Sequence, residues 1–123
     1  MKYIKTSSSI FEVVEETDLI YRVRAKHMPN KIYSKSNCQT EVLGESDELI
    51  YLINRIVIFN TNCSARVIYL KNQFEKLSYK EIMNDIRNGH KKVFGYIWFY
   101  LPCGAPRLEP VAELTKEGEW KLL

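Results

Sequence analysis

Five basic side chains between positions 19 and 37 are the best candidates for ligand chemistry. They are Arg22, Arg24, Lys26, Lys31 and Lys35. No acidic residue interrupts this stretch, which also contains tyrosines. Arg22, Arg24 and Lys26 alternate, so a strand would place them on one face. A row of positive charge beside an aromatic ring suits a phosphate backbone or a nucleotide. The stretch therefore predicts a small nucleic-acid- or nucleotide-binding site.

The same residues also fit an ordinary solvated strand face. Glu12 and Glu15 precede them, and further acids lie between positions 41 and 48. Unlike charges commonly pair across neighbouring strands without any ligand. The net charge of +3 is mild, whereas a dedicated DNA-binding domain usually carries a larger, clustered excess. Both interpretations stay open from the sequence.

A second candidate site is aromatic. The uncharged run VFGYIWFYL, residues 93–101, predicts a central strand covered on both faces. Alternation puts Tyr96, Trp98 and Tyr100 together on one face. If helices cover only the other face, this row becomes an apolar patch suited to a protein interface. The alternative is a core on both faces.

Catalytic chemistry has little support. An enzyme of unknown class could use Cys103 as nucleophile and His90 as base, but their spacing follows no known pattern. Neither His90 nor His27, the only other histidine, has a partner at metal-ligand spacing. The five glycines are isolated and form no phosphate-binding loop. We expect no catalytic residue, no metal and no cofactor.

Length and composition predict one domain in a reducing compartment. A chain of 123 residues can bury a hydrophobic core by itself. Its three cysteines are odd in number and form no CxxC pair, which argues against a disulfide scaffold. The first residues lack the apolar stretch of a signal peptide, and no apolar run is long enough to span a bilayer. We expect a cytoplasmic protein that does not bind membranes.

The first part of the predicted domain, residues 1–45, is a β-meander. Residues 10–26 predict a hairpin that pairs Val13 with Tyr21 and Phe11 with Val23. This register sets Glu12 opposite Arg22, and its short loop lacks the glycine that such turns favour. Two further strands are expected, at Lys31–Ser36 and Gln39–Leu43.

The second part, residues 46–92, mixes helices and strands. Ser46 suits a helix N-cap, which predicts a helix over 47–55 followed by a hairpin of 56–60 with 65–70. Whether 56–59 instead continues the helix is left open. Ser78 and Glu81 form a capping box, and Asn88-Gly89 suits a left-handed cap, so a second helix is expected over 79–87.

The third part, residues 93–123, is a second β-meander. The strand at 93–101 should pair with Leu108–Leu114, which would start near Val111 or lie at an edge because Pro110 lacks a donor. A short strand should follow at 120–123. We therefore predict an α+β fold, with an antiparallel, curled and partly barrel-like sheet and two short helices.

Both ends of the chain resemble a group of small uncharacterised proteins from phages and prophages of low-GC Gram-positive bacteria. The matching segments are KYIKTSSSIFEVVEETDLIYRVRAK, NKIYSKSN and SDELI, and then VFGYIWF with VAELTKEGEWKLL. The resemblance implies a phage or prophage origin and the cytosol of an infected cell. It supplies no catalytic residues.

The leading functional hypothesis is a non-enzymatic phage-type accessory protein that binds a host protein, as an inhibitor of a defence or regulatory factor. The first alternative is the nucleic-acid or nucleotide module with the basic strand face. The second alternative is an enzyme of unknown class. A homodimer is compatible with all three.

Overall fold

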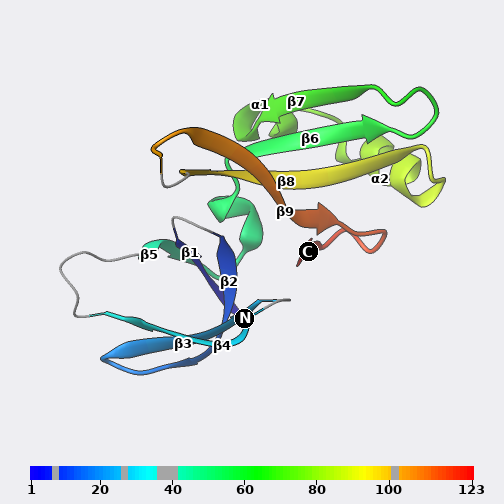
Figure 1. The fold of residues 1–123 in the computed structure, drawn as a ribbon. Coiled ribbons are helices and arrows are strands. Elements are labelled where there is room, and N and C mark those ends of the chain that lie inside the picture. The colour runs from blue at the N-terminus through cyan, green and yellow to red at the C-terminus, as the bar shows by residue number, and fades with distance from the viewer. Residues whose placement is uncertain (7–8, 26–27, 36–41, 101–102) are drawn as a thin grey trace. The chain divides into compact units, whose positions relative to one another are not determined.

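The structure is a computed structural model that describes residues 1–6, 9–25, 28–35, 42–100 and 103–123 (Figure 1). It contains two five-stranded, mostly antiparallel sheets and few helices, which confirms the α+β class. The strand order of neither sheet closes on itself, so the partly barrel-like form is not confirmed. The prediction of one sheet is wrong.

The residues group into two compact units, and each unit draws on more than one segment. Unit 1 consists of residues 1–52 and 99–107, and unit 2 of residues 53–98 and 108–123. The chain therefore passes between the units at 52/53, at 98/99 and at 107/108. The single domain divided into parts 1–45, 46–92 and 93–123 stays a prediction.

Unit 1 is built on a sheet of order β4-β3-β2-β1-β5. Its strands are β1 (Lys2–Thr6), β2 (Ile10–Glu16), β3 (Ile20–Ala25), β4 (Met28–Ser34) and β5 (Val42–Ser46). Ile4, Phe11, Val23 and Tyr33 pack together as its buried core. The sequence analysis missed β1, which lies between β2 and β5 and supplies Ile4 to this core.

The hairpin of β2 and β3 is confirmed, but its predicted register is wrong. Val13 lies opposite Val23 and Glu12 opposite Arg24, two residues from the predicted partners. The register shifts between Val13 and Glu15, as a bulge does when one strand holds an extra residue. Thr17 Oγ1 accepts hydrogen bonds from the N–H groups of Leu19 and Ile20 at 3.2 and 3.1 Å, and this closes the turn without glycine.

Unit 2 is built on a sheet of order β10-β9-β8-β6-β7. Its strands are β6 (Arg55–Asn60), β7 (Arg66–Leu70), β8 (Lys91–Tyr100), β9 (Pro106–Leu114) and β10 (Trp120–Leu122). The central position of β8 and the hairpin of β6 and β7 are confirmed. The predicted start of β9 near Val111 or at an edge is wrong, because β9 begins at Pro106 and lies between β8 and β10.

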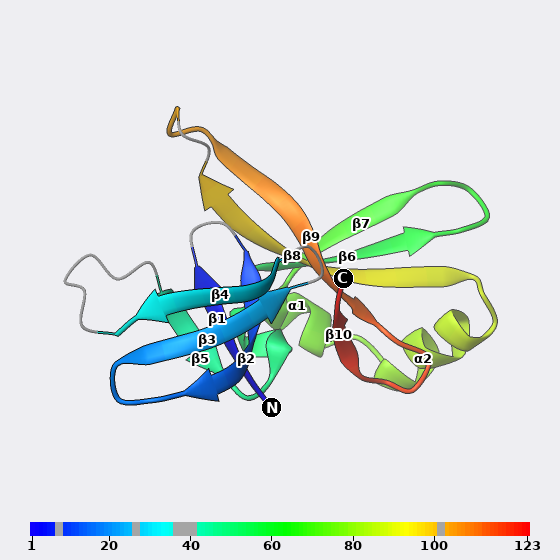
Figure 2. The ribbon, with the colours of Figure 1, turned by 60° about the horizontal axis from the view of Figure 1, so that its bottom comes forward.

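Two short helices, α1 (Lys71–Glu75) and α2 (Tyr79–Arg87), lie on one side of this sheet (Figure 2). Phe74 of α1 contacts Trp120 of β10, with ring centroids 6.3 Å apart. The predicted helix at 79–87 is confirmed: Ser78 Oγ accepts from the Glu81 N–H at 3.3 Å, and Ile82, Met83 and Ile86 are buried. The sequence analysis did not identify α1.

The predicted helix at 47–55 is wrong. Only a single 3-10 turn, Leu49–Leu52, forms there, and β6 begins at Arg55. Ser46 Oγ still accepts from the Glu48 N–H at 3.1 Å, as an N-cap would. The β-branched run Ile56-Val57-Ile58 pairs with β7 and β8, so the tertiary context ends the helix after one turn.

The two faces of β8 differ in burial, so the prediction that both are covered is wrong. Val93 and Ile97 are 0% exposed, whereas Trp98 on the opposite face is 38% exposed and Phe94 and Tyr96 are half-buried. Gly95 lies on the buried face, where Ile53 packs directly against its backbone. A Cβ atom on Gly95 would lie 2.9 Å from Ile53 Cγ1 and still closer to Cδ1.

Replacing Gly95 by alanine should therefore destabilise unit 2. We expect Gly95→Ala to lower the free energy of unfolding by roughly 1–3 kcal/mol, because the methyl group overpacks a filled site. Urea denaturation followed by circular dichroism measures this change. Gly44→Ala is the matched control, since a Cβ there would lie 3.5 Å from Leu52 Cδ2, an ordinary contact. Equal stability of the two variants would contradict the overpacking argument.

Candidate functional site

The sheet of unit 2 has one face without a helix, and this face is the first candidate site. The paired strands set which side chains share it: Val57 lies opposite Phe94 and Ile68, and Arg55 lies opposite Tyr96 and Leu70. We call this set the helix-free face. From β6, β7 and β8 it comprises Arg55, Val57, Phe59, Arg66, Ile68, Leu70, Lys92, Phe94, Tyr96 and Trp98.

Apolar and aromatic groups dominate the centre of the helix-free face. Phe59 and Phe94 meet edge to face, with ring centroids 5.5 Å apart and planes at 80°. Ile68 is 50% exposed and Leu70 40%. Trp98 on β8 is 38% exposed, whereas Val57 of β6, the strand between β7 and β8, is buried. Exposed apolar groups of this kind occur at protein interfaces.

Asn54 fixes the backbone on which Trp98 lies. Its N–H donates to the Tyr96 carbonyl at 2.9 Å, and its Oδ1 accepts from the Trp98 N–H at 3.0 Å. The side chain thus continues the ladder one step beyond Arg55, where β6 begins. The predicted interface residues Tyr96 and Trp98 share the helix-free face. Tyr100 ends β8, but its side chain lies outside the described part of the structure.

The predicted basic site does not share one face of unit 1. Arg22 lies opposite Ile32, while Lys31 lies opposite the buried Val23, so the arginines and Lys31 belong to opposite faces. Arg22 and Arg24 each pair with a carboxylate of β2, Glu15 and Glu12, both at 2.9 Å. Lys26 lies outside the described residues.

The two lysines of the set lie over aromatic rings. Lys31 Nζ is 4.9 Å from the centre of the Tyr33 ring, and Lys35 Nζ is 4.6 Å from that of Tyr21. Lys35 also pairs with Glu16 at 3.5 Å. Within the described part, every basic residue of the predicted site therefore has a partner inside unit 1. This agrees with the alternative interpretation, an ordinary solvated strand face.

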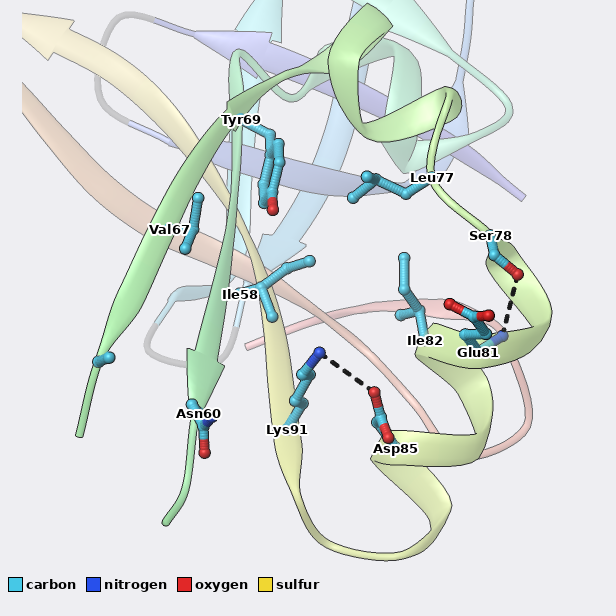
Figure 3. Close-up of a pocket in the computed structure, with 11 residues that line it drawn as sticks. Ile58, Asn60, Val67, Tyr69, Leu77, Ser78, Glu81, Ile82, Asp85 and Lys91 are labelled. Carbon is cyan, nitrogen blue, oxygen red and sulfur yellow. Dashed lines mark hydrogen bonds and ion pairs between the residues drawn. The ribbon is translucent and has the colours of Figure 1, made fainter. Parts of the chain in front are cut away.

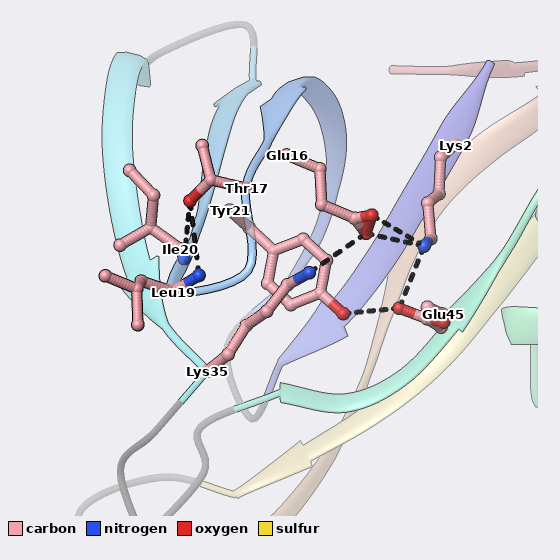
Figure 4. A network of polar contacts seen from close by, with 8 residues as sticks. All are labelled: Lys2, Glu16, Thr17, Leu19, Ile20, Tyr21, Lys35 and Glu45. Atoms are coloured by element: carbon pink, nitrogen blue, oxygen red, sulfur yellow. Dashed lines mark hydrogen bonds and ion pairs between the residues drawn. The ribbon is translucent and has the colours of Figure 1, made fainter.

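A polar network joins β1, β2, β3 and β5 around Tyr21 (Figure 4). Lys2 Nζ contacts Glu16 at 2.6 Å and Glu45 at 3.2 Å, and the Tyr21 hydroxyl donates to Glu45. The sequence analysis missed this network, because Lys2 comes from the unpredicted β1 and Glu45 from a strand placed too early.

The network shifts the pKa values of its members. The hydrogen bond to Glu45, and then desolvation, raise the pKa of Tyr21 to about 12. The Tyr21 hydroxyl and then Lys2 lower the pKa of Glu45, and Lys2 lowers that of Glu16. The hydrogen bond to Glu16 raises the pKa of Lys2. The shifts favour the neutral form of Tyr21 and the charged form of both carboxyl groups.

A groove of about 300 Å³ lies on the helical side of unit 2, between α2 and the strands β6 and β7 (Figure 3). Ile58, Val67 and Tyr69 line its sheet side, and Ile82 lines its helix side. At one end Lys91 pairs with Asp85 at 3.1 Å. The lining is mainly apolar, which suits side-chain packing better than catalysis.

No group of three or more His, Cys, Asp or Glu residues in the described ranges could hold a metal ion. In the same ranges no helix is long and apolar enough to cross a bilayer. A base at His90 would need a carboxylate to orient it, and the nearby Asp85 carboxylate pairs with Lys91 instead. Cys63 and Cys103 are exposed and free.

Comparison of the chain with models of protein families, with curated proteins and with solved structures finds no match. The resemblance to phage-encoded proteins stays a prediction, and the functional argument rests on the geometry.

The Tyr21 network predicts a loss of stability in acid that depends on Glu45. The carboxyl pKa of Glu45 is lowered from 4.5 in the folded chain. The charged carboxylate therefore adds to the free energy of unfolding above pH 4.5, and this stabilisation is lost as the pH falls through the pKa of the folded chain. Glu45→Gln should lower the urea midpoint at pH 7 and flatten its decline as the pH falls below 4.5. Glu117→Gln removes an equal charge, from a residue without an ion pair in the described part, and should keep the wild-type slope. Equal slopes for Glu45→Gln and wild type would contradict the network.

Proposed function

We propose that the protein has no catalytic role and acts by binding another protein through the helix-free face of unit 2. The observation that carries this proposal is the row of Phe94, Tyr96 and Trp98 on a central strand, on the side where no helix lies. Aromatic side chains, tryptophan above all, supply a large share of the binding energy at interface centres. Exposed aromatic residues lower the solubility of a protein unless a partner covers them.

The charges around the apolar centre indicate the chemistry of the partner. Arg55, Arg66 and Lys92 flank the aromatic row on β6, β7 and β8. A partner with an apolar centre and acidic groups at its rim would match this arrangement. On β9, alternation with the buried Ala112 and Leu114 puts Glu113 on the helix-free face as well.

The mixed charge favours a protein over a nucleic acid. A phosphate backbone is bound by clustered positive charge, and Glu113 would repel it. In unit 1, Arg22 and Arg24 are already paired with Glu15 and Glu12. The nucleic-acid or nucleotide alternative with Arg22, Arg24, Lys26, Lys31 and Lys35 therefore has less support than protein binding.

The resemblance to phage and prophage proteins supplies the biological setting of the proposal. In that setting the protein acts in the cytoplasm of an infected Gram-positive cell, and the partner is a host protein. Occupying a functional surface of a defence or regulatory factor would inhibit it without chemistry. This requires only an interface with an aromatic anchor, which Trp98 supplies.

Capture of a partner should depend on Trp98. We expect the tagged wild-type chain to retain a stoichiometric protein from a Gram-positive host lysate, and Trp98→Ala to retain at least about 10-fold less, because truncating a hot-spot tryptophan typically costs about 2 kcal/mol or more. Quantitative mass spectrometry of the eluates measures the ratio. Tyr51→Ala is the matched control, since Tyr51 is an exposed aromatic residue of unit 1.

Nuclease treatment separates the proposal from its alternative. Retention that survives nuclease and is lost in Trp98→Ala supports protein binding. Partners that vanish with nuclease, and that depend on Arg22 and Arg24 rather than on Trp98, would overturn the proposal in favour of nucleic-acid binding.

A further inference from the structure

Strand β7 is an edge of the unit 2 sheet with unused hydrogen-bonding groups. It pairs with β6 on one side only. The Asn60 N–H donates to the Ala65 carbonyl at 2.8 Å, so residues 65, 67 and 69 point their backbone groups toward β6. The N–H and C=O groups of Arg66 and Ile68 therefore point away from the sheet, and no other residue of the described ranges bonds to them.

The other edge strands in the described part carry features that block pairing, and β7 does not. β4 contains Pro29 and Lys31, β5 contains Gly44 and Glu45, and β10 has only three residues, including Lys121. Proline, charged residues and short length are the usual protections of a sheet edge. The residues of β7 from Val67 to Leu70 include no charge, no proline and no glycine.

The exposure of β7 matches its lack of protection. Val67 and Ile68 are each 50% exposed and Leu70 is 40% exposed, although all three are large and apolar. Val67 faces the groove side and Ile68 the helix-free side, so both faces of the edge are apolar. A strand that covered this edge would bury apolar area on both faces.

β7 is complementary to itself. In an antiparallel pair centred on Ile68, each Ile68 lies opposite its copy, Val67 opposite Tyr69, and Arg66 opposite Leu70. Because Ile68 points its N–H and C=O outward, the two copies of Ile68 can exchange two hydrogen bonds. Leu70 adds no further bond, because its N–H donates to Gln73 Oε1 at 3.0 Å and its C=O, at the N-cap of α1, accepts the first bond of that helix. The seam therefore has two backbone hydrogen bonds, both between the copies of Ile68.

No like charges oppose each other in this register. The only charged residue of β7 is Arg66, and it faces Leu70 of the other copy. Apolar pairs on both faces and the absence of opposed charge favour a second copy over an unrelated strand.

We propose that β7 is the seam of a two-fold homodimer, in which two copies of the chain pair β7 antiparallel about Ile68. The unit 2 sheet of one copy and that of the other then form one continuous sheet, and the helix-free faces of the two copies join. This inference does not depend on the host partner, because it concerns only the edge of unit 2.

The seam is short, so the dimer should depend on concentration. A seam of five residues from each copy belongs with the small interfaces of weak, transient complexes, so we expect dimerisation at concentrations of about 1–100 µM. Sedimentation velocity across this range should show monomer at the low end and dimer at the high end. A monomer at every concentration up to about 1 mM would overturn the proposal.

Cysteine cross-linking tests the register. In a background of Cys38→Ser, Cys63→Ser and Cys103→Ser, Ile68→Cys puts two thiols opposite each other at a Cα separation of about 5.5 Å, within the disulfide range. Mild oxidation should join the copies at least about 10-fold faster than for Leu70→Cys. Leu70 is the matched control, since it lies on the same face with similar exposure but opposite Arg66. Equal cross-linking rates would overturn the register.

A charge variant tests the seam independently of oxidation. Ile68→Lys places two ammonium groups opposite each other, and we expect dimerisation to weaken at least about 10-fold. Ile32→Lys on β4 is the control: Ile32 is exposed and lies on an edge strand of unit 1. Circular dichroism melting verifies that both variants fold. A dimer that survives Ile68→Lys, or one that only Ile32→Lys disrupts, would exclude the β7 seam.

Discussion

Unit 2 depends on the contact between the Ile53 side chain and the backbone of Gly95. Only a residue without a side chain lets Ile53 approach β8 this closely, and the neighbouring Asn54 then bonds to Tyr96 and Trp98. The pairing of β6 with β8 follows directly, with Ile56 opposite Gly95. Because alternation is strict, this register also places Phe94, Tyr96 and Trp98 on the face that carries no helix. The contact at Gly95 and the set of side chains on the helix-free face therefore depend on the same register.

Unit 1 relies on polar contacts as well as on its core, since its five strands bury few large apolar side chains. Tyr21 lies beneath Lys2 and Lys35, whose amines are 5.7 and 4.6 Å from the ring centre. Both amines also pair with carboxylates, so cation–π contacts and ion pairs act together at one end of the sheet. Of the basic set, Arg22, Arg24, Lys31 and Lys35 each take part in contacts within the sheet itself.

Local signals in the sequence were reliable, and signals that depend on distant pairing were not. The α2 helix was predictable because Ser78 and Glu81 satisfy each other within one turn. The helix expected at 47–55 ends early because Ile56, Val57 and Ile58 pair with β7 and β8 as part of β6. β1 was missed because its short run of alternating residues becomes a strand only between β2 and β5. Alternation predicted the shared face of Tyr96 and Trp98, but the separation of Lys31 from Arg22 required the register of β4 on β3.

The path of the chain between the units has a consequence for dissecting the protein. Residues 99–107 belong to unit 1, although residues 53–98 and 108–123 on either side belong to unit 2. No single cut in the chain therefore releases an intact unit, and a fragment that ends at residue 52 lacks part of its own unit. All residues of the first unit are present only once residue 107 has been made. A chain that stops between residues 53 and 107 therefore lacks part of both units, whereas one that stops after residue 107 lacks only part of the second.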